Sequence, residues 1–131
     1  MERLLLMLAA HAVADYPLQG DFLAKAKNRS APLPGVPWWQ ALGAHAVIHG
    51  AAVGIITRSP ALGVAETIVH AITDDLKCNG RLSYNQDQAI HAGCKLVWAL
   101  AASAIEARRA ETAQHGSVAD ESAVPQGDAH D

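Results

Sequence analysis

The stretch His70-Ala-Ile-Thr-Asp74-Asp75-Leu-Lys77 decides the fold of this chain. We read it as about one and a half turns of helix. His70 and Asp74 are four residues apart, so they lie on one face with Cβ atoms about 5–6 Å apart. The residues of 65–72 around His70 are mostly apolar or small. This pattern predicts that the His/Asp pair faces the interior of the protein.

The same four-residue spacing recurs in three other apolar segments. These pairs are His11/Asp15, His45/His49 and Asp87/His91. Five of the seven histidines belong to the four pairs, and the other two, His115 and His130, lie in a polar tail. Four helices that each offer two metal-type ligands predict one of two interiors, a buried metal site or a hydrogen-bonded polar core.

Length and composition favour one helical domain. A chain of 131 residues can bury a single core. Half of its residues are hydrophobic, mainly Ala, Leu, Val and Ile, and this composition favours closely packed helices. Residues 1–110 carry ten basic and eight acidic side chains, and residues 111–131 carry five acidic side chains and no Lys or Arg. The basic residues are scattered, which argues against nucleic-acid binding.

The cysteines and the apolar segments indicate where in the cell we expect the protein to be. Cys78 and Cys94 are too few for a disulfide framework or a thiolate zinc site, so we expect reduced thiols and a cytoplasmic protein. His11 and Asp15 interrupt the apolar N-terminal run, which argues against a secretory signal. The segment 41–57 is apolar apart from two histidines, and its 17 residues are at the short limit for a membrane span. Membrane association therefore stays open.

The sequence predicts an all-α fold, a compact bundle of four longer helices plus one short helix. The longer helices are expected over residues 2–15, 38–57, from 60 up to Gly80, and from the cap at Ser83 to about Arg109. The short helix is expected over 21–27. Residues 1–110 then form the bundle domain, and 111–131 form a disordered acidic tail because they offer little to bury.

The expected helix boundaries rest on local signals. Pro17 should end the first helix, because the residue before a proline is pushed out of the helical region. Asp21 is expected to cap the short helix, and Ser59 the helix that begins at the following proline. Gly80 suits a left-handed helix end. The segment 83–86, Ser-Tyr-Asn-Gln, matches a capping box.

The free-energy cost of burying charged groups distinguishes the two interpretations of the polar pairs, a metal site and a hydrogen-bonded core. Burying uncompensated charges costs several kcal/mol each, and pairing rarely repays this in full. Three carboxylates and five imidazoles would consume much of the roughly 5–15 kcal/mol by which a domain is stable. A divalent cation would remove this cost, and ligands from several helices do converge inside bundles. Zn²⁺ is the first expectation, with Mn²⁺ or Fe²⁺ as alternatives. Surplus ligands would hold a second metal about 3.5–4 Å away or orient the first set.

Two side chains near the polar pairs each have two alternative roles. Lys77 could hold a substrate phosphate, but an ordinary ion pair with Asp74 is the simpler expectation. Gln19 could place a neutral hydrogen-bonding group at the rim of the site, or it could belong only to a turn that ends the first helix.

These motifs resemble those of domain-of-unknown-function family 3307, a family of small phage and bacterial proteins. The family pattern is His-x3-Asp-(Phe/Tyr)-x-Leu-Gln, a Lys, a helical His, His-x3-Asp-x2-Lys and Asp-Gln-x2-His. The matching parts of this chain are 11–19, Lys27, His45 or His49, 70–77 and 87–91. The resemblance brings no established activity, and it implies a hydrophobic, membrane-associated protein. The ligand pattern is also similar to that of helical zinc phosphodiesterases of the phospholipase C and P1-nuclease type, by analogy of fold.

We therefore expect a metal-dependent hydrolase that acts on a phosphoester or another small molecule. The expected metal ligands are His11, Asp15, His45, His70, Asp74, Asp87 and His91. The expected catalytic residues are His49, as a further ligand or general base, Lys77, which would stabilise phosphate charge, and Gln19. The alternative is a non-catalytic, membrane-associated or partner-binding helical protein whose polar pairs only fix helix register. The sequence leaves the oligomeric state open.

Overall fold

The computed structural model describes residues 1–122, and their regular structure is entirely helical. The α-helices are α1 (Glu2–Val13), α2 (Gly20–Ala26), α3 (Trp38–Thr57), α4 (Pro60–Cys78) and α5 (Tyr84–Ser122). A five-residue π-helical segment, η1 (Ala14–Leu18), joins α1 to α2. The predicted all-α class, with four longer helices and one short helix, is confirmed.

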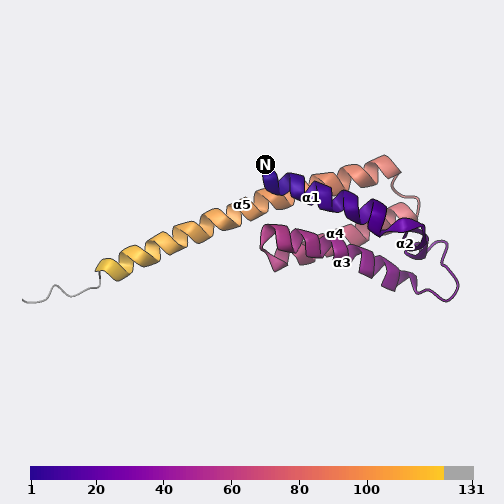
Figure 1. Cartoon of the computed structure of the whole chain (residues 1–131), viewed down its shortest axis with the longest axis horizontal. Helices are drawn as coiled ribbons and strands as arrows, with labels where there is room; N and C mark the ends of the chain where they lie inside the picture. Colours follow the sequence, from indigo (N-terminus) through magenta and orange to yellow (C-terminus); the bar gives the residue numbers. More distant parts are fainter. Residues whose placement is uncertain (123–131) are drawn as a thin grey trace, which may run out of the picture.

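The helices α3 and α4 form a tight hairpin, and α1 and α5 pack against it (Figure 1). Glycines permit the close approach within the hairpin. A Cβ atom on Gly63 of α4 would lie 2.7 Å from the carbonyl oxygen of Gly50 on α3. The close helix packing that the composition favours is therefore found where the backbones of α3 and α4 nearly touch.

The interior of the bundle is apolar at one end and polar at the other. The apolar end is centred on Met7, Val53, Leu62 and Ala102, with Trp98 packed at its side. Beyond it the buried side chains are mostly ionisable, and they form the cluster described below. Cys78 and Cys94 are both free thiols, as expected.

The capping signals behave as predicted around α4 and α5. Ser59 accepts a hydrogen bond from the backbone of Leu62 at 3.4 Å and so caps α4. Gly80 adopts a left-handed conformation, with φ of 70°, just after α4 ends. In the capping box, the Ser83 hydroxyl accepts from the Gln86 backbone N–H at 3.3 Å, and the Gln86 side chain accepts from the Ser83 N–H at 2.9 Å.

The connection from α1 to α2 differs from the expectation. Pro17 does not end the helix, because the wider π turn of η1 contains it. A π turn shifts the backbone hydrogen-bond register by one residue, and such turns commonly occur at functional sites. The break comes three residues later, at Gly20, where φ is 53°. The prediction that Asp21 caps α2 is also wrong, because α2 begins at Gly20 with no side-chain cap.

The C-terminal helix is longer than expected. We expected it to end near Arg109, but α5 continues to Ser122 and runs beyond the other helices (Figure 1). Residues 106–115 are exposed, so intrinsic helix propensity, and not burial, supports this part. A disordered tail was expected from residue 111, whereas the structure describes residues 111–122 as part of this helix. The remainder of the expected tail, 123–131 with His130, lies outside the described residues.

Candidate metal centre

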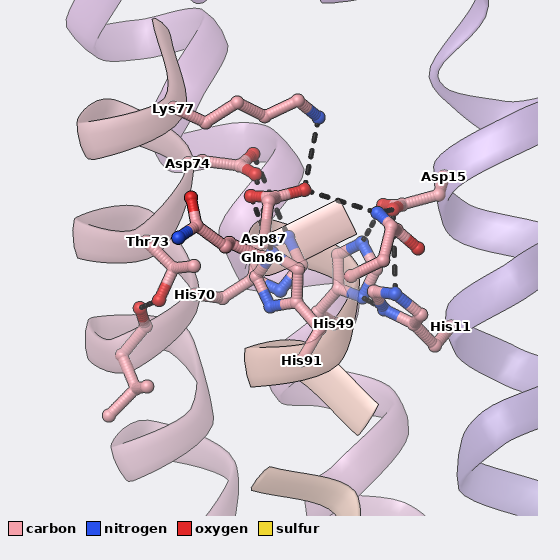
Figure 2. Close-up of polar contacts among 12 residues, drawn as sticks. His11, Asp15, His49, His70, Thr73, Asp74, Lys77, Gln86, Asp87 and His91 are labelled. Carbon is pink, nitrogen blue, oxygen red and sulfur yellow. Dashed lines mark hydrogen bonds and ion pairs between the residues drawn. The ribbon is translucent and has the colours of Figure 1, made fainter. Parts of the chain in front are cut away.

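Five buried imidazoles from four helices meet at the polar end of the bundle. They are His11 of α1, His45 and His49 of α3, His70 of α4 and His91 of α5. The ring centroids of His49 and His70 are 3.6 Å apart, and those of His70 and His91 are 4.1 Å apart. Figure 2 shows the side chains of His11, His49, His70 and His91 directed toward one shared space. The four-residue pairs in the sequence do converge. His115 lies apart, exposed on α5.

The carboxylate of Asp15, carried by the π-helical segment, lies against the histidines of α1 and α3. Its Oδ1 is 3.1 Å from Nε2 of His49 and 3.4 Å from Nε2 of His45. Its Oδ2 is 3.4 Å from Nε2 of His11. Asp15 is therefore surrounded by imidazoles on three sides.

Asp74 and Asp87 occupy the side of the cluster toward α5. Nε2 of His91 is 3.3 Å from Oδ1 of Asp87 and 3.5 Å from Oδ1 of Asp74. The second oxygen of Asp74, Oδ2, is 3.4 Å from Nε2 of His45. Asp74 thus contacts histidines of both α3 and α5, and all seven predicted metal ligands lie in one cluster, together with His49.

The spacings between these atoms match those between the ligands of a metal. Ligand atoms at about 2.0–2.1 Å from a tetrahedral zinc lie about 3.3 Å from one another. Most of the inward-facing nitrogen and oxygen atoms also lack a hydrogen bond. These orphaned atoms include Nε2 of His11, His45, His49, His70 and His91 and Oδ1 of Asp15 and Asp87. A closed hydrogen-bonded core would satisfy such atoms, because buried polar groups without partners are costly.

Two overlapping ligand sets could each hold a cation. One comprises Asp15, His45, His49 and His70, and the other comprises His70, Asp74 and His91. Within each set the candidate ligand atoms all lie within 4.8 Å of one another. Histidine nitrogens with carboxylate oxygens suit Zn²⁺ and also other first-row divalent metals.

A buried ion pair supports the cluster from the apolar side. Glu66 lies 3.3 Å from Nδ1 of His70 and accepts hydrogen bonds from Lys95 and from the indole of Trp98, each at 2.5 Å. This group was not predicted from the sequence. Its signal was present, because Glu66 precedes His70 by four residues and Lys95 follows His91 by four. The polar faces of α4 and α5 each extend by one more turn.

Burial keeps most of the histidines neutral. It lowers the pKa of His70 to about 3, although the neighbouring Glu66 opposes the shift. It lowers the pKa of His11 to about 4 in the same way, against the attraction of Asp15. Neutral imidazoles are the form that binds metals.

The acidic side of the cluster is held in its ionised form. Burial would raise the pKa of Asp74, but the close approach of His91 and the charge of Lys27 outweigh it and hold the pKa below the usual range. Burial would likewise lower the pKa of His91, but the close, negatively charged carboxylates of Asp74 and Asp87 raise it to about 9. In the metal-free protein a proton on His91 therefore neutralises part of the charge of these carboxylates.

The lysines differ from the expectation. Lys77 does not pair with Asp74. Its ammonium is 3.1 Å from Oδ2 of Asp87, across the gap to α5. The partner of Asp74 is Lys27, which is buried and also donates to the side-chain oxygen of Gln19. Gln19 thus reaches the cluster only through Lys27. The Lys77 side chain is 28% exposed, so it stands between the cluster and solvent.

Neither a family model, nor a curated protein, nor a solved structure matches this chain. The resemblance to domain-of-unknown-function family 3307 therefore stays an expectation drawn from the motifs.

Proposed function

We propose that this protein binds a divalent metal in the histidine–aspartate cluster and uses it for hydrolysis. The observation that carries the proposal is the group of orphaned Nε2 and carboxylate atoms from four helices, buried together at ligand-to-ligand spacings. Burying these groups without a cation would oppose folding, whereas a cation would compensate both the carboxylates and the imidazoles.

The ligands of the primary site are Asp15, His45, His49 and His70, with Zn²⁺ as the first candidate and Mn²⁺ or Fe²⁺ as alternatives. His49 acts here as a ligand, because its Nε2 faces Asp15 and its Nδ1 lies 3.3 Å from Nδ1 of His11. A metal in such a site supplies a water of lowered pKa, the nucleophile of hydrolytic chemistry.

The basic residues beside the cluster favour an anionic substrate such as a phosphoester. Lys77 is partly exposed and Lys27 is buried against Asp74, so two ammonium groups flank the ligands. In the proposed reaction Lys77 holds a substrate oxygen. Gln19 orients Lys27 through their hydrogen bond and is a positioning residue.

The test begins with metal content. Protein purified without an affinity tag is analysed for metals, and its hydrolysis of an aryl phosphodiester is measured before and after chelation. Wild-type protein should contain stoichiometric metal, and Asp15→Asn should lose both metal and turnover. Asp21→Asn is the matched control, since Asp21 is exposed on α2. Absence of metal after dialysis against Zn²⁺, Mn²⁺ and Fe²⁺ would overturn the proposal. Bound metal without hydrolysis of the phosphodiester would reject the proposed hydrolase activity and leave the proposed metal binding standing.

A second candidate is a membrane-associated protein, and the outer surface of the bundle favours it. Large apolar side chains are exposed on all four longer helices, among them Leu5, Leu6, Val47, Ile55, Val64, Ile68, Ile72, Leu96, Val97 and Leu100. Within residues 4–14, 38–57, 61–73 and 88–105, no exposed side chain is charged. Exposed apolar surface on this scale commonly marks a membrane or partner contact.

Helix length alone is weaker support for this candidate. Of the described helices, α3 is long and apolar enough to cross a membrane, but a core helix of a soluble protein passes the same test. Co-sedimentation with phosphatidylcholine vesicles is the measurement, and Ile55→Glu should weaken it because Ile55 is 77% exposed. Wild-type protein that stays in the supernatant without detergent would reject membrane association.

A further inference from the structure

We infer that the cluster holds two cations, with Asp74 bridging them. The second cation is bound by Asp74, Asp87 and His91. This inference rests on the proposed metal site and deepens it. The primary set of Asp15, His45, His49 and His70 leaves three further ligands of the cluster unused, Asp74, Asp87 and His91.

The unused ligands lie together at the α4–α5 side. Nε2 of His91 is 3.3 Å from Asp87 and 3.5 Å from Asp74, again close to the ligand separation around a tetrahedral metal. Oδ1 of Asp87 and Nε2 of His91 have no hydrogen bond. Three protein ligands with one open position are the usual set of a catalytic zinc.

The two oxygens of Asp74 face different ligand sets. Oδ1 lies toward His91, and Oδ2 lies 3.4 Å from Nε2 of His45 in the primary set. Oδ2 also accepts from Lys27, and a carboxylate oxygen has a second lone pair for a metal. A carboxylate used in this way joins two ions about 3.5–4 Å apart, the separation found in two-metal hydrolytic sites.

The remaining histidines do not compete for the second ion. His70 offers only Nε2 to the cluster, because its Nδ1 faces Glu66, so it can serve one ion at a time. Both ring nitrogens of His11 face the primary set, because Nε2 lies 3.4 Å from Asp15 and Nδ1 lies 3.3 Å from Nδ1 of His49, so His11 orients the primary ligands. Lys77 pairs with Oδ2 of Asp87, so a cation can use Oδ1 without breaking that ion pair (Figure 2).

Metal stoichiometry tests the inference without reference to activity. Tag-free protein is stripped with chelator, dialysed against Zn²⁺, passed through a desalting column and analysed for zinc per chain. Wild type and Asp21→Asn should hold two zinc ions, and Asp87→Asn should hold one. A single zinc in wild type, or two in Asp87→Asn, would overturn the second site while leaving the proposed function standing. No zinc in any protein would overturn both.

A measurement on the unaltered chain covers the case in which Asp87→Asn fails to fold. Wild-type protein is titrated with Mn²⁺ and followed by electron paramagnetic resonance. Two ions bridged by Asp74 should couple, so the spectrum of isolated Mn²⁺ should give way to that of a coupled pair between the first and second equivalents. A spectrum of isolated, uncoupled ions at the second equivalent would overturn the bridged pair.

Discussion

Replacing Lys95 with methionine should cost about 3–5 kcal/mol of unfolding free energy, because it breaks a buried ion pair from one side. Lys95 and Glu66 are each 1% exposed, and the ammonium lies 2.5 Å from Glu66. Methionine keeps most of the volume of the lysine stem, so the loss comes from the charge and not from a cavity. The Glu66 carboxylate would retain only its contacts with Trp98 and His70.

The measurement is urea unfolding followed by circular dichroism, with chelator present so that metal binding does not contribute. Lys25→Met is the control, since Lys25 is exposed on α2 and its loss should change stability by no more than about 0.5 kcal/mol. The double variant Glu66→Gln/Lys95→Met removes both charges and should recover most of the loss. The reasoning fails if Lys95→Met is as stable as Lys25→Met, or if the double variant is no more stable than Lys95→Met alone.

Two other predictions concern the metal-free protein and the α3–α4 hairpin. In chelator, thermal stability should peak near neutral pH. Burial lowers the folded-state pKa of His70 to about 3, below the usual value of 6.5, so stability is lost as pH falls below neutral. The neighbouring carboxylates raise the folded-state pKa of His91 to about 9, so stability is lost as pH rises from neutral toward 9. A steady rise of the melting temperature from pH 4 to 9 would contradict this. Gly50→Ala should destabilise by about 1–3 kcal/mol in urea unfolding, because its Cβ would lie 1.9 Å from Oγ1 of Thr67. The Cβ of Gly43→Ala would have nothing within 4 Å, so this variant should gain up to about 1 kcal/mol of unfolding free energy. A Gly43→Ala variant less stable than Gly50→Ala would refute the packing argument.

The helices could be predicted from the sequence wherever local signals decide them. The proline that opens α4, Gly80 and the capping box at 83–86 act within a few residues, so their effects need no knowledge of tertiary contacts. The π turn escaped prediction because Pro17 usually ends a helix, and only the widened hydrogen-bond register accommodates it. The far part of α5 escaped prediction because a polar composition favours disorder without excluding an exposed helix.

The candidate site could be predicted as a set of residues but not as a set of partners. Four-residue spacing identified which histidines and carboxylates face inward, because that spacing fixes the face of a helix. Which side chain meets which depends on how the helices rotate and pack. The sequence therefore paired Lys77 with Asp74, its neighbour on α4, whereas Lys27 from α2 takes that position. Glu66 and Lys95 were overlooked because each extends an already recognised pair by one turn.

Because of the π-helical segment, the geometry of the cluster depends on the number of residues in 14–18 as well as on the identity of the ligands. Residues of an α-helix advance by about 100° each, so removing one residue from 14–18 would turn everything upstream by more than a quarter circle. His11 would then turn away from His49 and toward the exposed apolar face of α1, although no ligand had been substituted. A deletion at this point should disable the centre as thoroughly as the loss of a histidine, while a change of side chain at the exposed position 18 should pass unnoticed.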